Sequence, residues 1–215
     1  MSYSQEYYQN RDRYPMWRVE ACIARDLIGS AVDGVVVDLG CGSGELLRVI
    51  RPKIGIGIDL NEQAIQLARA HDGGYEFRIG NAAEPSLLDE SVDCIVNMHL
   101  FEHLSEAKAA LRSWHRALKP GGRLVILTPN GDFSHPEEFD DPDHKHIYRG
   151  PELAALLEQS GFLVGRILTV GLWGMRRWPF FWRYQWLCER VQLPNCPGLR
   201  WRGQTLSLSA TKGTL

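Results

Sequence analysis

Short apolar runs rich in valine and isoleucine alternate along the chain with segments whose apolar residues recur at helical spacing. An apolar run bounded by turn residues is typical of a buried strand, and its alternation with helices indicates βα units of a parallel sheet. The predicted strands are residues 34–39, 54–59, 75–80, 92–98, 123–129, 162–170 and 204–212. Because crossovers between parallel strands are right-handed, we expect an α/β fold, a doubly wound and mostly parallel seven-stranded sheet with helices on both faces.

Three of the predicted helices have recognisable ends. The side chain of Asn61 is expected to cap helix 61–71, and that of Ser105 to cap a helix that ends at the turn 119–122. A later helix has proline in its first turn and stops at Gly161, where glycine permits a positive φ.

A glycine-rich turn follows the first strand, in the sequence VVVDLGCGSGELL. Gly40, Gly42 and Gly44 have the spacing G-x-G-x-G, whereas a dinucleotide loop needs G-x-G-x-x-G and has glycine where Glu45 stands here. A P-loop would need G-K-[ST] at its second glycine, and no lysine is there. The spacing therefore disfavours both kinds of phosphate loop.

Two carboxylates flank the ends of the first two strands. Asp38 precedes the glycine loop, where its charge would repel a pyrophosphate and attract an ammonium group. Asp59 ends the second strand, the position from which an acid binds a ribose diol in nucleotide-binding α/β folds. A ligand with a ribose and an ammonium group but no phosphate fits both positions.

At this point the chain resembles the class I S-adenosylmethionine-dependent methyltransferases, in particular the small-molecule (type 11/23-like) group. The resemblance covers about residues 34–170 and the final strand at 204–212. Its motifs, in the family's order, are VVDLGCGSGELL, IGIDLN, IGNAAEP, VDCIVNMHLFEHL and LKPGGRLVILTPN. It implies a Rossmann-like methyltransferase fold and S-adenosyl-L-methionine as the cofactor, with S-adenosyl-L-homocysteine as its product.

The resemblance also implies which residues bind the cofactor. Asp38 and the loop backbone would hold the methionine part, Asp59 the ribose hydroxyls, and Leu60 the adenine ring. Asn81, where the family usually has aspartate, can accept from the adenine amino group through its amide oxygen. The full predicted set is Asp38, Gly40, Cys41, Gly42, Gly44, Asp59, Leu60, Asn81, Ala82 and Asn97.

Candidate catalytic residues follow the fourth and fifth strands. Methyl transfer to a hydroxyl needs alignment and a general base, so we expect His99, after the fourth strand, to face the site. His103 belongs to an EH pair that serves either function or packing. The resemblance implies that the loop after the fifth strand borders the substrate, with His144 as a candidate base and Tyr148 as an orienting hydroxyl.

Residues 131–148 hold six acids and three histidines, a composition that suits Zn, Fe or Mn. The spacings match no standard zinc arrangement, however, and Pro136 and Pro142 break any helical face that would align ligands. We therefore expect a solvated acidic loop and no metal.

Two terminal additions are candidates for choosing the substrate. Residues 3–18 are rich in tyrosine and arginine, which suits a lid or an ordinary amphipathic helix that covers the sheet edge. Residues 171–203 hold five of the seven tryptophans, with Trp178, Trp182 and Trp186 on one helical stripe. That stripe fits a packed helix, an apolar substrate lid or a peripheral membrane contact.

The overall charge and the cysteines narrow the class of protein. A net charge of −2 and a pI of about 6.4 give no basic excess, so we expect no nucleic-acid partner. The five cysteines form no C-x-x-C pair, no apolar run reaches membrane-spanning length, and the N-terminus is too polar for a signal peptide. These features predict a cytoplasmic, reduced protein without an integral membrane span.

The sequence thus predicts one domain over residues 1–215, with an N-terminal lid or helix (1–30), a core (31–170), an insertion (171–203) and a last strand (204–212). We expect a methyltransferase of small molecules, with O-methylation favoured. Transfer to N or C of a sugar, lipid-linked or quinone-type substrate remains open. A catalytically silent binding module and an NAD-dependent oxidoreductase are the rival classes.

Overall fold

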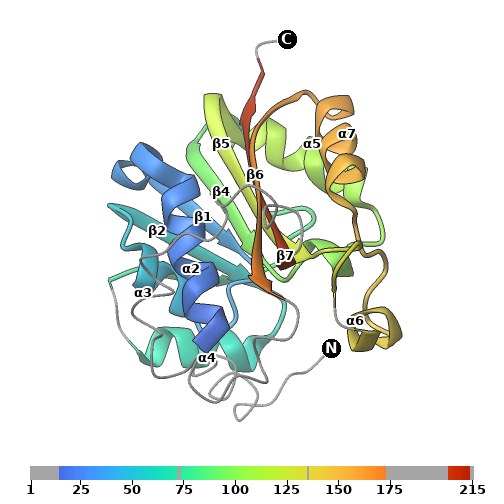
Figure 1. Cartoon of the computed structure of the whole chain (residues 1–215). Helices are drawn as coiled ribbons and strands as arrows, with labels where there is room; N and C mark the ends of the chain where they lie inside the picture. Colours follow the sequence, from blue (N-terminus) through green and yellow to red (C-terminus); the bar gives the residue numbers. More distant parts are fainter. Residues whose placement is uncertain (1–14, 72–73, 135, 173–202, 214–215) are drawn as a thin grey trace.

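The computed structural model describes residues 15–71, 74–134, 136–172 and 203–213. Within them, seven strands form one sheet in the order β3-β2-β1-β4-β5-β7-β6 (Figure 1). β1 to β5 are parallel, and β7 runs antiparallel between β5 and β6. The strands are β1 (Val35–Leu39), β2 (Ile54–Asp59), β3 (Glu76–Ile79), β4 (Val92–Met98), β5 (Leu118–Pro129), β6 (Phe162–Leu172) and β7 (Gly203–Lys212). The predicted doubly wound, mostly parallel sheet is confirmed.

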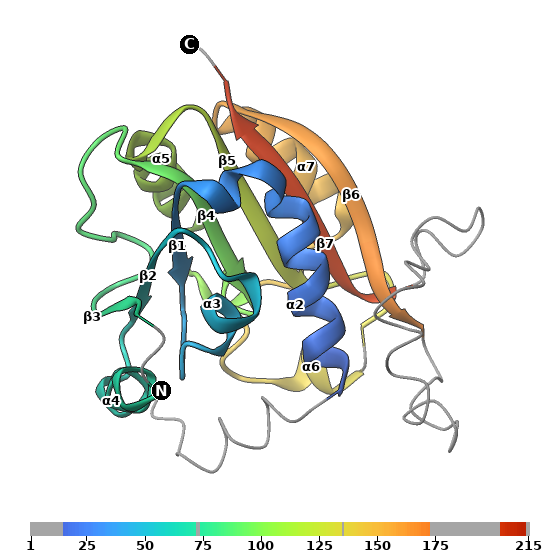
Figure 2. The same ribbon diagram turned by 90° about the vertical axis from the view of Figure 1, so that its left-hand side faces the viewer.

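Helices cover both faces of the sheet, as Figure 2 shows. One face packs against α2 (Pro15–Ile28), α3 (Glu45–Ile50) and α4 (Glu62–Ala70), and the other against α5 (Ala107–Ala117) and α7 (Gly150–Gln159). Two 3₁₀ turns, η1 (Gly29–Asp33) and η2 (Phe101–His103), and the short α6 (Pro136–Asp140) complete the described elements. Each face has its own apolar core, and β4 contributes to both by alternation of its side chains.

The predicted helix ends are partly confirmed. Asn61 caps α4, because its side-chain oxygen accepts from the amides of Gln63 and Ala64. Gly161, just after α7, has a φ of 86°, as the predicted stop requires. The Ser105 cap is wrong, since α5 begins at Ala107 after Glu106 and has no side-chain cap.

The turn 119–122 is partly as predicted, because Gly121 has the expected positive φ, but the turn lies inside β5 and does not precede it. β5 begins at Leu118, and its register with β4 shifts between the pairs Val92–Leu118 and Cys94–Arg123, so the turn residues form a bulge inside the strand. Lys119 in this bulge donates to Asp93 at 2.8 Å, which fastens it to β4.

The helix α2 covers only the end of the segment 3–18 that was predicted as a lid or an amphipathic helix, and the choice between the two stays a prediction because residues 3–14 lie outside the described residues. In α2, Trp17 and Leu27 are 4% and 1% exposed against the sheet. The tyrosines of residues 3–14, His135 and the tryptophan stripe of 173–202 lie outside the described residues. Among the described helices, none combines the length and apolar character needed to cross a bilayer.

Candidate functional site

The glycine loop joins β1 to α3 at the carboxyl edge of the sheet. Gly40, Gly42 and Gly44 have φ of 73°, 52° and 77°, which glycine adopts without strain. The amides of Gly40 and Cys41 donate to the carbonyl of Ile58, and that of Gly42 donates to Asp59 Oδ2 at 2.8 Å. Phosphate loops turn such amides toward an anion. Here these amides are used to attach the loop to β2, which agrees with the expectation of a ligand without phosphate.

Gly44 explains why the last glycine of this loop is needed. A Cβ placed there would lie 2.5 Å from ring atoms of Phe77 in β3. The loop and the start of α3 therefore approach the sheet too closely for any side chain at this position.

Asp59 fixes the shape of the loop. Its Oδ1 accepts from the amide of Asn61 at 2.8 Å, and its Oδ2 accepts from Gly42. Each carboxylate oxygen has a second lone pair, so the group can also accept from a diol. Asp38, the other predicted acid, is 1% exposed beneath the loop.

Two exposed apolar side chains lie beside Asp59. Leu60, predicted to contact adenine, is 70% exposed, and Ile79 at the end of β3 is 52% exposed. Ile79 pairs in register with Asp59, so the two apolar residues follow neighbouring strand ends. Sequence reasoning missed Ile79 because the last apolar residue of a strand reads as core. Each offers exposed apolar area of the kind that a purine ring covers.

The next two predicted cofactor residues are used within the protein. Asn81 Oδ1 accepts from the amide of Ala83 at 3.0 Å, which forms a turn rather than leaving that lone pair free. Ala82 is 5% exposed, and its carbonyl accepts from Trp114 Nε1 at 2.8 Å. Contact with a ligand here would use the second lone pair of the Asn81 oxygen or its amide nitrogen.

Asn97, near the end of β4, is fully buried, and neither its amide nitrogen nor its oxygen has a hydrogen bond to any described residue. Buried amides are nearly always hydrogen-bonded, so this one marks a place where a ligand or water completes the structure. Its predicted place in the cofactor site remains a prediction that this observation supports.

His99 lies between two carboxylates at the end of β4. Its Nε2 is 3.0 Å from Glu20 Oε2, and its Nδ1 is 3.6 Å from Glu102 Oε1. Burial opposes the charged imidazolium, but the two acids outweigh it and raise the pKa of His99 well above its usual value. A raised pKa disfavours the neutral imidazole that a general base needs, and the role of His99 at the site stays a prediction.

Glu20 is a residue of this site that our sequence interpretation missed, although its position in the sequence carries a signal. Glu20 is 6% exposed on the apolar stripe of α2 that also contains Trp17, Ala24 and Leu27. An acid in such a stripe needs a buried partner, and His99 is that partner.

Glu102, in η2, is 1% exposed and accepts from the hydroxyl of Thr128 at 2.9 Å. Burial raises the pKa of this carboxyl, but the hydrogen bond from His99 and its charge bring the pKa below its usual value. The backbone carbonyl of Glu102 accepts from the amides of Lys145 and His146, which brings the loop after β5 onto η2.

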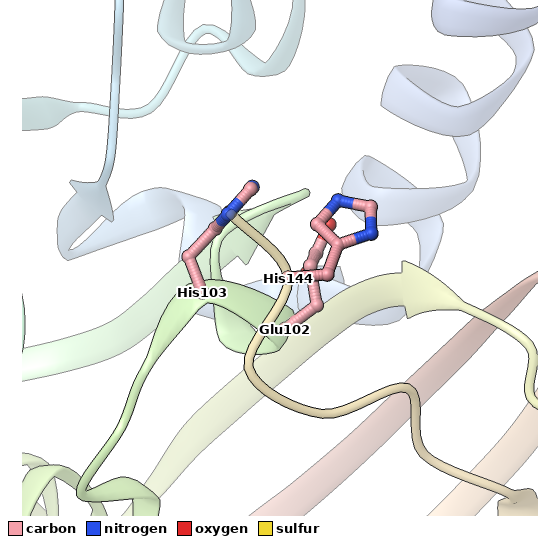
Figure 3. A group of neighbouring side chains, drawn as sticks. All are labelled: Glu102, His103 and His144. Carbon is pink, nitrogen blue, oxygen red and sulfur yellow. The ribbon is translucent and has the colours of Figure 1, made fainter. Parts of the chain in front are cut away.

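That contact brings two predicted histidines together. His103 Nδ1 lies 3.2 Å from the carbonyl of Asp143, His144 Nδ1 lies 2.7 Å from the carbonyl of Glu138, and the ring centroids are 4.8 Å apart. Figure 3 shows both rings on the same side as the side chain of Glu102. The structure therefore groups Glu102, His103 and His144 at the carboxyl edge, next to His99.

Tyr148 is set apart from this group. It is 6% exposed, its ring packs 5.1 Å from that of Phe101, and burial, aided by the charge of Glu152, raises the pKa of its hydroxyl. His146, which lies between His144 and Tyr148 in the sequence, has its Nε2 2.6 Å from Glu152 Oε1. The described contacts give Tyr148 a place in the core, and an orienting role for its hydroxyl remains a prediction.

Known proteins share this architecture. An S-adenosylmethionine-dependent methyltransferase from Mesorhizobium loti superposes with a TM-score of 0.71 at 19% identity, covering 94% of this chain and 99% of that one. A sheet of this order with a glycine loop and an acid after β2 defines the class I methyltransferase fold.

The chain belongs to the family described as "Methyltransferase domain", whose model matches residues 11–165. That family is the S-adenosylmethionine-dependent one that the motifs resemble, so the predicted family and its cofactor are confirmed.

Two curated relatives have functional names. The chain is 32% identical over 151 residues to a "Demethylmenaquinone methyltransferase" of Tropheryma whipplei, covering 67% of this chain and 60% of that protein. It is 32% identical over 102 residues to a "Ubiquinone biosynthesis O-methyltransferase" of Idiomarina loihiensis, covering 44% of this chain and 42% of that protein. The chain spans about half the length of the curated relatives it matches.

Proposed function

We propose that this chain transfers a methyl group from S-adenosylmethionine to an oxygen atom of a small molecule. The observation that carries the proposal is the grouping of Glu102, His103 and His144 beside the glycine loop. A Cβ at Gly40 would lie 3.0 Å from Leu100 Cδ1, and Leu100 immediately precedes η2. The segment that carries Glu102 and His103 therefore starts next to the glycine loop, which is assigned to the methionine part of the cofactor.

The residues present fit the cofactor. Leu60 and Ile79 offer an exposed apolar surface for the adenine, and Asp59 keeps lone pairs for the ribose hydroxyls. The loop amides bound to Ile58 and Asp59 leave no phosphate cradle in this part of the structure, which suits a nucleoside without phosphate.

When bound, S-adenosylmethionine supplies a methyl group on a positively charged sulfur. Transfer forms an oxygen–carbon bond as the sulfur–carbon bond breaks, and the proton of the acceptor hydroxyl must leave. Since a backbone carbonyl only accepts, His144 Nδ1 is the protonated nitrogen and Nε2 carries the lone pair. We propose His144 Nε2, beside His103, as the group that faces the acceptor hydroxyl.

Both named relatives support a quinone-type ring as the acceptor. Transfer to a ring carbon or a nitrogen is the alternative, and it would need no base beside the acceptor when that nucleophile is an amine. Product analysis by mass spectrometry with hydroxylated and non-hydroxylated quinone precursors separates the two, because only the hydroxylated ones can form a methyl ether.

The first test is thermal unfolding with about 1 mM S-adenosylhomocysteine, with NAD as the control ligand. A ligand that binds only the native state raises the unfolding midpoint by mass action, so we expect a shift with S-adenosylhomocysteine and none with NAD. No shift with S-adenosylhomocysteine would remove the cofactor from the proposal. A shift without turnover on any hydroxylated acceptor would favour a silent binding module.

A further inference from the structure

We propose that Glu102, His103 and His144 bind one divalent first-row transition-metal ion. Each of the three offers one ligand atom, and these atoms all lie within 4.8 Å of one another. Figure 3 shows two of the side chains on η2 and the third on the loop that crosses it. The site therefore depends on the hydrogen bond from the Lys145 amide to the Glu102 carbonyl, which holds the loop against η2.

Contacts with backbone carbonyls orient both histidine rings. His103 Nδ1 and His144 Nδ1 each face a backbone carbonyl, which accepts and cannot donate. Each Nδ1 is therefore an N–H donor, and in the neutral ring the lone pair is on Nε2. A ligating imidazole commonly has this arrangement, in which the second nitrogen donates to a carbonyl that fixes the ring.

The carboxylate is oriented in a similar way. Glu102 is 1% exposed, and Thr128 donates to its Oε2 at 2.9 Å. Its Oε1 lies 3.6 Å from His99 Nδ1, so both carboxylate oxygens have a polar neighbour in the protein. A buried carboxylate in a fixed direction loses little entropy on binding a metal.

The ligand set indicates the class of metal. Two imidazole nitrogens with one carboxylate suit zinc, iron(II) or manganese, whereas magnesium and calcium favour sites made of oxygen atoms. Three protein ligands leave coordination positions open for water or substrate. Ligand atoms around a metal with bonds of about 2.1 Å lie roughly 3–3.5 Å apart, so the side chains draw inward when the ion binds.

The site also explains why the sequence pattern argued against a metal. That argument required a continuous helical face in residues 131–148, which Pro136 and Pro142 interrupt. In the structure two ligands are neighbours in η2, and the loop supplies only His144. A ligand set split between two segments has no standard spacing in the sequence.

The consequence for the reaction rests on the proposed function. A cation here would lower the pKa of a hydroxyl that coordinates it, so the acceptor's proton would leave to solvent and its oxygen would form the bond to the methyl carbon as the sulfur–carbon bond breaks. With the metal bound, His144 is a ligand and no longer the base proposed above, because one lone pair cannot bind a metal and accept a proton together.

Cobalt(II) titration of the metal-free full chain tests the site. The visible absorption of cobalt responds to the nitrogen ligands, and zinc should displace the ion at one equivalent. We expect His103→Ala and His144→Ala each to weaken binding at least about 100-fold, since loss of even an outer-shell partner costs 10–100-fold. His146→Ala, a histidine of the same loop paired with Glu152, should bind as the wild type does.

Two outcomes would overturn the metal site. One is the absence of one-to-one binding at about 100 μM cobalt, and the other is a cobalt affinity of the His103 and His144 variants equal to that of the wild type. Binding of S-adenosylhomocysteine to the same variants is measured in parallel by calorimetry. It should be unchanged, which shows that the variants fold, and it tests the proposed function separately from the metal.

Discussion

Glu20 Oε2 lies 3.0 Å from His99 Nε2, although the two residues are 79 positions apart. The other carboxylate oxygen of Glu20 accepts from the hydroxyl of Thr205 in β7. One buried acid of α2 therefore links the N-terminal helix, the end of β4 and the last strand. The positive φ of His99, 55°, aims the side chain toward this acid.

Replacement of Glu20 by glutamine should lower the pKa of His99. In the metal-free protein this is measured by NMR titration of the ring protons of His99. The variant should also lose about 1–2 kcal/mol of unfolding free energy, a moderate value because the side chain of His99 is 37% exposed.

The pH dependence of this loss follows from the direction of the pKa shift. The folded-state pKa of His99 is raised, so its ion pairs stabilise the fold fully below the unfolded pKa of about 6.5 and fade as pH rises through the folded value. The difference between wild type and Glu20→Gln should thus be larger at pH 6 than at high pH. Glu158→Gln, an exposed acid on α7, should show no such trend.

Asp59→Ala should weaken binding of S-adenosylhomocysteine by about 1.5–3 kcal/mol, roughly 10- to 150-fold, in calorimetry. The variant loses the proposed diol contact and also the acceptor for the amides of Gly42 and Asn61. Asp89→Ala, which removes an exposed acid paired with Arg116, is the matched control and should bind normally. Equal affinity in the Asp59 variant would remove this carboxylate from the site.

The sequence predicted the sheet well because each strand is an apolar run with its own turn residues. Backbone preference and burial act locally at such positions, so the strand β2 and the Asn61 cap could be predicted from the residues alone. The bulge at 119–122 could not, because it depends on Lys119 reaching Asp93 on a neighbouring strand.

The candidate site shows the same division. The loop glycines and Asp59 form a contiguous motif, whereas Glu20, Thr128 and Ile79 acquire their meaning from residues far away in the sequence. A motif search finds the first kind. The second kind appears only when the sheet places the strand ends side by side.

The exposed apolar surface offers a prediction that separates binding from stability. Leu60→Ala and Ile79→Ala should each reduce affinity for S-adenosylhomocysteine by about 0.5–1.5 kcal/mol, since each loses part of the area that adenine covers. Their unfolding midpoints without ligand should stay near the wild-type value, because both side chains are more than half exposed. Leu163→Ala, at an equally exposed position on β6, should change neither quantity.

Gly44→Ala should destabilise the fold by about 2–4 kcal/mol in chemical unfolding, through two separate effects. The position has a φ of 77°, which costs an alanine about 1–2 kcal/mol, and the new methyl would lie 2.5 Å from Phe77, which adds the cost of overpacking. Gly121→Ala isolates the first effect, because its φ is 71° and a Cβ there meets nothing within 4 Å. A loss equal to that of Gly121→Ala would mean that α3 can move away from β3, and that this contact does not set the height of the loop above the sheet.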